Sequence, residues 1–422
     1  MCAEQSADDL ALSLATAANA AASTVASAST EQKNDALRRL VVLLGERVEP
    51  ILEANRRDLE AGSERGLSAA LMDRLRLDAQ RIQGMAEGVA QVVELPDPVG
   101  TEDSMGPRPN GLEVSRIRIP LGVICIIYES RPNVTIDAGA LCLKSGNVPL
   151  LKGGKEAFHT NMVLVELMRE ALEDAGLPPD AVQAVATSDR EVLAGLIRSD
   201  GLVDLVIPRG GEGLIRYVTA NATVPVIQHY KGVCHVYVDQ TADLRMAEDI
   251  AFNAKVQRPG VCNAMETLIV HRDVAPRLVP ALFRRYEEAG VTLRVDARTR
   301  ALWPGAEAAT EDDWDAEYLD LILSVRLVDH LDEALAHIRK HGSGHTESIV
   351  TSDDVARDRF LLQADASCVM VNASTRFNDG FELGLGAEIG ISTSRIHAFG
   401  PMGLEELTTR KFVVRGSGQI RG

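Results

Sequence analysis

The N-terminal part of the chain, from about residue 5 to 95, has apolar residues spaced three and four positions apart. The run Ala36-Leu-Arg-Arg-Leu-Val-Val-Leu-Leu and the stretch 71–93 both show this spacing, which puts the apolar side chains on one face of a helix. The segments Pro96-Asp-Pro and Gly106-Pro-Arg-Pro-Asn-Gly then interrupt the pattern with turn-forming residues. We therefore predict a helical region, a loop-rich break and a short strand over residues 114–119.

After Pro120, short apolar runs alternate with helical stretches. The runs span residues 123–128, 148–151, 181–186 and 203–207, and the helical stretches span residues 136–143, 158–175, 191–197 and 212–220. This alternation is typical of βαβ units, in which helices cover both faces of a parallel sheet. A second α/β passage runs from about His235 to Val371, with strands expected at residues 267–270, 321–328 and 349–350 and a helix at 331–340.

The charge balance narrows the choice of partners. The 422 residues include 44 basic and 61 acidic ones, for a net charge of −17. The electric field of a protein with this negative net charge repels nucleic acid and anionic membranes, so we expect neither as a partner. The N-terminus carries early acids and no basic segment, which argues against a signal peptide, and the apolar run 121–128 is too short to cross a bilayer. We predict two or three domains in a cytoplasmic protein.

The cysteines and histidines show no metal-binding pattern. Six cysteines are widely spaced without a CxxC pair, which fits a reducing compartment better than a disulfide framework. Cys125, Cys234 and Cys368 lie within apolar, strand-like runs, where a thiol usually acts as a small buried apolar group. The segment His341-Gly-Ser-Gly-His345 lacks a third ligand nearby, so we interpret its histidines as loop residues and predict no metal site.

Cys262 is the best candidate for a reactive thiol. It lies in the segment Asn253-Ala-Lys-Val-Gln-Arg-Pro-Gly-Val-Cys-Asn-Ala-Met-Glu-Thr, where a helix that begins near Asp243 should end around Pro259. A turn and nearby cations favour the thiolate, and Lys255 and Arg258 supply positive charge. A lone cysteine is more often buried and inert, so this spacing alone leaves both interpretations open.

Three strand ends carry candidate ligand-binding turns. Tyr128-Glu-Ser-Arg-Pro-Asn-Val-Thr follows an apolar run, and polar residues at such a place face the ligand edge of an open α/β sheet. The segments Leu150-Leu-Lys-Gly-Gly-Lys-Glu and Leu205-Val-Ile-Pro-Arg-Gly-Gly-Glu-Gly each read as strand, glycine turn and helix, which suits a phosphate at a helix N-terminus. Neither is a GxGxxG motif, and all three segments are also compatible with ordinary turns.

Together these segments resemble the aldehyde dehydrogenase superfamily, and most closely its γ-glutamyl phosphate reductase branch. The resemblance covers nearly the whole chain after residue 30, with blocks in the family's order. These blocks are Pro120-Leu-Gly-Val-Ile, Tyr128-Glu-Ser-Arg-Pro-Asn-Val-Thr, Leu141-Cys-Leu-Lys-Ser-Gly-Asn, Leu151-Lys-Gly-Gly-Lys-Glu-Ala, Gln257-Arg-Pro-Gly-Val-Cys-Asn-Ala-Met-Glu-Thr, Gly342-Ser-Gly-His-Thr-Glu and Glu382-Leu-Gly-Leu-Gly-Ala-Glu-Ile-Gly-Ile-Ser-Thr-Ser.

The resemblance implies an α/β fold with two α/β domains built on parallel-type sheets, and a small β oligomerisation arm. A Rossmann-like cofactor domain would comprise residues 1–102 and 121–232, with residues 372–398 returning to it. The catalytic domain would span residues 233–371, and the arm residues 103–120 and 399–422. In the arm, we expect the strand 114–119 to be an unpaired edge that the tail strand 412–415 of a partner subunit covers in a homodimer or tetramer.

The resemblance also implies roles for individual residues. Cys262 would be the nucleophile, and Asn133 the side-chain donor to the oxyanion. Cofactor-binding residues would be Lys152, Lys155, Gly210, Gly211 and Glu317. Substrate-binding residues would be Arg131, Arg376 and Glu129, since arginine suits the carboxylate and phosphate of the substrate. Lysines rather than an acid follow the strand before residue 152, which favours the 2′-phosphate of NADPH.

The reaction implied is the NADPH-dependent reduction of L-glutamyl 5-phosphate to L-glutamate 5-semialdehyde through a cysteine thioester. Gln228 stands where the hydrolytic relatives carry a glutamate that activates water, and a reductase should lack that base. An alternative is a CoA-acylating aldehyde dehydrogenase, and a rival of another class is a catalytically silent structural oligomer. A separate glutamate 5-kinase would supply the acyl phosphate.

Overall fold

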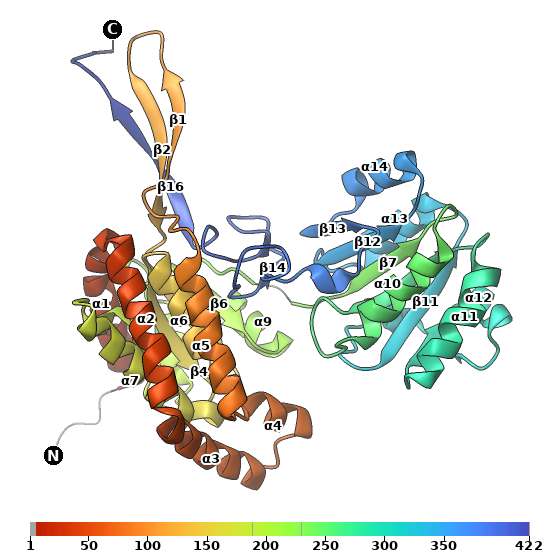
Figure 1. Ribbon diagram of the computed structural model, residues 1–422, viewed down its shortest axis with the longest axis horizontal. Coiled ribbons are helices and arrows are strands. Elements are labelled where there is room, and N and C mark those ends of the chain that lie inside the picture. Colours follow the sequence, from red (N-terminus) through yellow and green to blue (C-terminus); the bar gives the residue numbers. More distant parts are fainter. Residues whose placement is uncertain (1–5, 188, 229, 422) are drawn as a thin grey trace. The chain divides into compact units, whose positions relative to one another are not determined.

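The chain divides into two compact units. The computed structural model describes residues 6–187, 189–228 and 230–421, with the side chain of residue 70 left out (Figure 1). Unit 1 comprises Met1–Gln228, Gly384–Gly390 and Met402–Gly422, and unit 2 comprises His229–Leu383 and Ile391–Pro401. The expectation that residues 372–398 return together to unit 1 is therefore wrong. Only Gly384–Gly390 does so, because β14 (Ile391–Ser392) pairs with β15 (Gly400–Pro401) within unit 2.

Unit 1 begins with five helices, as the apolar spacing predicts. They are α1 (Ala7–Ser27), α2 (Thr30–Glu46), α3 (Val48–Glu64), α4 (Ala69–Leu75) and α5 (Ala79–Glu94). Four of them start at a serine or aspartate whose side chain accepts a backbone N–H, as at Ser29 and Asp78. Among the described residues, α1 is the one helix long and apolar enough to cross a membrane. A stripe along it is nevertheless buried within the unit: Ala11, Ala15, Ala18, Ala21 and Val25.

A four-stranded parallel sheet in the order β5-β4-β3-β6 forms the centre of unit 1. Its strands are β3 (Val123–Tyr128), β4 (Val148–Gly153), β5 (Gln183–Ala184) and β6 (Leu205–Arg209). The helices that follow them are α6 (Asn133–Lys144), η1 (Lys155–Ala157), α7 (Phe158–Asp174), η2 (Pro179–Ala181), α8 (Glu191–Leu196) and α9 (Glu212–Asn221). Every residue of β3 is buried, as expected for a central strand covered on both faces. The predicted βαβ alternation is confirmed.

An antiparallel arm of three strands also belongs to unit 1 and projects from it in Figure 1. The order is β1 (Glu102–Pro107), β2 (Glu113–Pro120) and β16 (Thr408–Arg415). Strand β2 pairs along its whole length with β16 of the same chain, from Pro120 opposite Thr408 to Glu113 opposite Arg415. The expectation that a partner's tail covers an unpaired β2 is therefore wrong. The chain's own C-terminus fills that place, so the edges of this sheet are β1 and β16.

Unit 2 is built on a seven-stranded parallel sheet in the order β10-β9-β11-β8-β7-β12-β13. The strands are β7 (Cys234–Val238), β8 (Met265–His271), β9 (Thr292–Val295), β10 (Glu307–Ala308), β11 (Ile322–Val328), β12 (Thr346–Val350) and β13 (Cys368–Val371). The helices are α10 (Leu244–Val256), α11 (Ala275–Glu288), α12 (Ala297–Leu302), η3 (Glu311–Asp315), α13 (Leu331–His341), α14 (Asp354–Gln363) and η4 (Thr375–Phe377). The second predicted α/β passage is confirmed.

Side chains that alternate along the strands of unit 2 form two separate cores. On one face, Val236 and Leu268 pack with α10 and α11. On the other face, Tyr237 and Ile269 pack with α13 and α14. The sheet is thus buried on both faces, and the loops at either end of its strands extend from this packed core.

Candidate active site

In unit 2, Cys262 lies in the turn between α10 and β8, as predicted. Helix α10 is capped by Asp243 and ends at Val256, and the partly buried Cys262 precedes β8 by three residues. Gly232, just before β7, lies directly against this turn, because a Cβ on it would stand 2.7 Å from the Cα of Cys262. The thiol of Cys234 donates to the Cys262 carbonyl across 3.1 Å. The backbone of Cys262 is thus held from the side of β7.

The other described cysteines are poor nucleophiles. Burial raises the pKa of the Cys125 thiol to about 12 and also raises the pKa of Cys142. Burial, with the nearby charges of Glu347 and Cys262, raises the pKa of Cys234 well above its usual value. Burial likewise raises the pKa of Cys368. Because the thiolate is the reactive form, these four thiols stay protonated and unreactive at neutral pH.

Arg376, in η4, lies beside the residue that follows Cys262. Its Nε donates to the Gln257 side chain across 2.8 Å, and its Nη1 donates to the Asn263 side chain. Burial and the neighbouring Arg258 lower the pKa of Arg376, and the Cys262 thiol interacts with it electrostatically. A depression of about 230 Å³ opens here, lined by Asn253, Gln257, Arg376, Phe377, Asp379 and Glu382. The structure therefore places an arginine at a hollow next to the predicted nucleophile.

Glu317 is linked to the turn that carries Cys262 through Gly232. Its carboxylate accepts the backbone N–H of Gly232 across 2.9 Å. Glu266 holds the loop that carries Glu317 in place. Its carboxylate accepts the Leu319 N–H across 3.4 Å and pairs with the Lys255 ammonium across 2.6 Å. Both members of this ion pair are fully buried, and burial, opposed by Lys255, raises the pKa of Glu266 to about 7. The expectation that Lys255 supplies charge for the thiol is wrong, because its ammonium is paired with Glu266.

In unit 1, Asn133 is the first residue of α6, just past the carboxyl end of β3. The chain turns sharply between the two elements, with Ser130 at a φ of 32°. The Asn133 Nδ2 donates to Asp137 Oδ2, one helical turn further on, across 2.8 Å. Burial raises the pKa of Asp137 to about 6, opposed by this hydrogen bond and by the charge of Arg209. Arg131 is exposed in the same turn.

The two predicted cofactor lysines differ in environment. Lys152, in β4, is 7% exposed and donates weakly to the carbonyls of Gly153 and Thr187 across 3.4 and 3.5 Å. Burial lowers its pKa, opposed by Glu156. Lys155 is exposed at the start of η1. Both lie at the carboxyl end of β4, on the edge where β3 and β6 also end.

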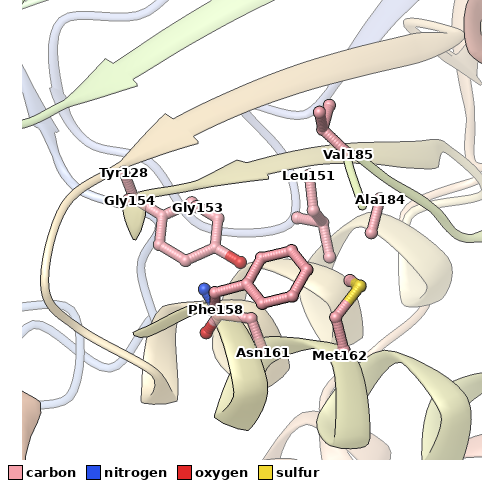
Figure 2. Close-up of a pocket in the computed structure, with 9 residues that line it drawn as sticks. All are labelled: Tyr128, Leu151, Gly153, Gly154, Phe158, Asn161, Met162, Ala184 and Val185. Carbon is pink, nitrogen blue, oxygen red and sulfur yellow. The ribbon is translucent and has the colours of Figure 1, made fainter. Parts of the chain in front are cut away.

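A small cavity lies beneath this edge (Figure 2). Its lining comes from the ends of β3, β4 and β5 and from α7, and consists of Tyr128, Leu151, Gly153, Gly154, Phe158, Asn161, Met162, Ala184 and Val185. The volume of about 10 Å³ admits roughly one water molecule. A Cβ on Gly153 would stand 3.3 Å from the Tyr128 ring and would also collide with the Asn161 amide. The cavity is therefore a packing feature under the edge and too small for a ligand.

Gly210 and Gly211 form the turn from β6 into α9, and Glu129 lies against them. The Gly211 N–H donates to the Glu129 carboxylate across 2.9 Å, and a Cβ on Gly210 would stand 2.7 Å from that carboxyl group. An anion at the amino end of a helix is stabilised by the unpaired N–H groups there. The predicted phosphate-binding turn thus already holds a negative charge from the chain itself.

Comparisons with known proteins show which family the chain resembles. A model of the aldehyde dehydrogenase family matches residues 2–301. A γ-glutamyl phosphate reductase of Moorella thermoacetica is 55% identical over 96% of this chain and 97% of its own length. Another, of Carboxydothermus hydrogenoformans, is 55% identical over 98% of this chain and 100% of its own length. The crystal structure of the Thermotoga maritima γ-glutamyl phosphate reductase is 46% identical, with a TM-score of 0.96 over 98% of this chain and 100% of that one.

The chain belongs to the aldehyde dehydrogenase family. Within that family it groups with the γ-glutamyl phosphate reductases, and the resemblance stated from the sequence is confirmed. The roles of single site residues stay predictions, although the structure gathers them into two sets. Unit 2 holds Cys262, Glu317 and Arg376, and one sheet edge of unit 1 holds Asn133, Arg131, Glu129, Lys152, Lys155, Gly210 and Gly211.

Some residues that contact the candidate site residues were not predicted from the sequence. Asp137 could have been noticed, because it lies four residues after Asn133 on the same helix face. Gly232 gave a weaker signal, as a glycine just before an apolar run. Glu266 gave none, because its partner Lys255 is identified only by the packing of α10 on β8.

We expect the substitution Cys262→Ala to lower the turnover rate by at least about 10³-fold, as removal of a nucleophile does, with unit 2 still folded. The variants Cys125→Ala, Cys142→Ala, Cys234→Ala and Cys368→Ala should each retain turnover, because these thiols stay protonated. Steady-state rates and thermal unfolding of all five variants check this. A Cys262→Ala enzyme with substantial activity would show that the reaction is not covalent.

Proposed function

We propose that the protein reduces L-glutamyl 5-phosphate to L-glutamate 5-semialdehyde and phosphate with NADPH, the second step of proline biosynthesis from glutamate. The observation that carries this proposal is the full-length match to γ-glutamyl phosphate reductases at 55% identity. The site agrees with it, since a partly buried cysteine lies in a turn next to an arginine that suits an anionic substrate.

In the proposed reaction, the Cys262 thiolate attacks the acyl phosphate carbon. The C–O bond to phosphate breaks, phosphate leaves with the electron pair, and a thioester remains on the cysteine. Gln228 has no carboxylate to activate water, so the thioester is not lost to hydrolysis. The Asn133 amide donates to the oxyanion that forms on the substrate carbon, a contribution of roughly 3–4 kcal/mol for such donors. When the aldehyde forms, the C–S bond breaks and the thiolate is regenerated.

NADPH, when bound, would supply the hydride that reduces the thioester. The residues proposed to hold it are Lys152, Lys155, Gly210, Gly211 and Glu317. The four residues of unit 1 fit such a group, because the Gly211 N–H already binds a carboxylate and two lysines lie at the carboxyl end of β4, on the same edge of the sheet. A diphosphate at this turn would take the place of the Glu129 carboxylate.

The substrate carries a carboxylate, an ammonium and a phosphate. We propose that Arg131 and Arg376 bind its two anionic groups, as arginine's planar fork suits both. The hollow beside Arg376, with Asp379 and Glu382 in its lining, supports a site for a charged amino acid. Glu129 is the candidate for the ammonium when it is displaced from Gly211.

We further propose a cytoplasmic homodimer or tetramer that assembles through the arm. Phe412 and Val414 are 64% and 56% exposed on the edge strand β16, and an apolar strand edge invites pairing with another chain. The acyl phosphate would come from a separate glutamate 5-kinase. Sedimentation of Phe412→Asp tests the arm, because wild-type size in that variant would contradict an interface there.

The proposed activity is tested in reverse, with glutamate 5-semialdehyde, phosphate and NADP⁺ and with absorbance of the reduced cofactor as the readout. We expect reduction of NADP⁺ that depends on phosphate and is absent in Cys262→Ala. Coenzyme A in place of phosphate is the control that distinguishes a CoA-acylating dehydrogenase. Activity with CoA but not with phosphate would overturn the proposal, and no activity with either would favour a structural role.

We expect NADP⁺ to be preferred over NAD⁺ by at least about tenfold in kcat/KM, which corresponds to about 1.4 kcal/mol. The reason is that Lys152 and Lys155 place positive charge at the end of β4. The variant Lys155→Glu should lose this preference, whereas Arg57→Glu, the same charge change at an exposed site on α3, should keep it. Equal use of both cofactors by the wild-type enzyme would contradict the assignment.

A further inference from the structure

Asp137 has a single, well-defined contact with the predicted oxyanion donor. Asn133 and Asp137 are four residues apart on α6 and therefore lie on the same helix face. The Asn133 Nδ2 and the Asp137 Oδ2 are 2.8 Å apart. An ionised carboxylate can only accept hydrogen bonds, so the amide must turn its Nδ2 and not its Oδ1 toward Asp137.

This orientation decides what Asn133 can do. Its NH₂ group has two protons, of which one is donated to Asp137 and the other stays available to a second acceptor. In the opposite orientation Oδ1 would face the Asp137 carboxylate and repel it. An oxyanion at that end of the amide would then meet an oxygen, which cannot donate a hydrogen bond. Nothing within the Asn133 side chain favours one orientation over the other, so the preference comes from its neighbour.

The surroundings keep Asp137 in the charged form that this arrangement needs. The charged group facing it is Arg209, at the end of β6. Arg209 is itself packed against Gly390, where a Cβ would stand 2.8 Å from the guanidinium carbon. Burial raises the pKa of Asp137 to about 6 and Arg209 opposes that rise, so the carboxylate is ionised at neutral pH.

We propose that Asp137 is a positioning residue of the reductase, whose carboxylate fixes the Asn133 amide so that an Nδ2 proton is presented to the substrate oxyanion. This inference rests on the proposed function, in which Asn133 is that donor. Asp137 acts through Asn133 alone and makes no contact of its own with substrate.

The test is a double-mutant cycle of Asn133→Ala, Asp137→Asn and the double variant. Asn133→Ala should lower kcat by about 10²–10³-fold, as loss of an oxyanion donor does. Asp137→Asn should lower kcat by about tenfold, because a neutral amide accepts either orientation of its neighbour, and it should leave the KM for NADPH within about twofold. The double variant should match Asn133→Ala alone, since the effect of Asp137 requires the Asn133 side chain. Asp78→Asn, at the exposed cap of α5, is the matched control with wild-type rates.

The pH profile gives a second readout. The arrangement exists while Asp137 is charged, so wild-type kcat/KM should fall as the pH drops through about 6. The ratio of wild-type to Asp137→Asn rates cancels the titration of the substrate itself. That ratio should be about tenfold at pH 8 and approach one below pH 5.

The outcomes distinguish a failure of the proposed oxyanion role of Asn133 from a failure of the positioning role of Asp137. Full activity of Asn133→Ala would remove the oxyanion role from the proposed function. An impaired Asn133→Ala combined with an Asp137→Asn effect that multiplies with it would show that Asp137 stabilises the fold and does not position the amide. Should Asp137→Asn fail to fold, Asp137→Glu keeps the charge and should retain most activity with the acid limb intact. A folded Asp137→Glu enzyme without that limb would overturn the inference.

Discussion

The contact between Gly232 and the backbone of Cys262 is the constraint on which the catalytic side of unit 2 depends. Any side chain at residue 232 would collide with that backbone, so the loop before β7 and the turn before β8 pass each other only at a glycine. Their close passage brings the Gly232 N–H to Glu317 and the Cys234 thiol to the Cys262 carbonyl. One glycine thus fixes Cys262 relative to Glu317, a residue proposed to hold the cofactor.

The sequence predicted helices and strands best where the apolar periodicity was long. It predicted the positions of candidate residues best where a known rule for strand ends applied. The expected run 123–128 is the strand β3 residue for residue, and the capping aspartate and Pro259 correctly left Cys262 in a turn. Parallel sheets bind ligands at the carboxyl ends of their strands, which located the unit 1 candidates. In unit 2 the rule fails, because Cys262 and Glu317 precede β8 and β11. Only the resemblance identified Glu317.

Pairings between distant segments could not be predicted from local pattern. Lys255 looked like a cation for the thiol, yet it is buried against Glu266, and removing one member of such a pair typically costs about 3–5 kcal/mol. Strand β2 looked like an edge, yet the distant C-terminal strand β16 pairs with it. In both cases the local sequence shows a group that needs a partner, an ammonium in one and a strand edge in the other. Which residues become the partner depends on how distant parts of the chain pack together.

The net charge of −17 bears on what the surface as a whole repels, but it does not predict what a single site attracts. Exposed charges are screened over about 10 Å, whereas a binding group is governed by its immediate neighbours. At the turn before α9, the Gly211 N–H holds the Glu129 carboxylate. At α6, Arg209 helps to keep Asp137 ionised against the cost of burial. Backbone N–H groups and single cations at strand ends therefore hold carboxylates in an acidic protein, and the proposed anionic cofactor and substrate would be bound in the same way.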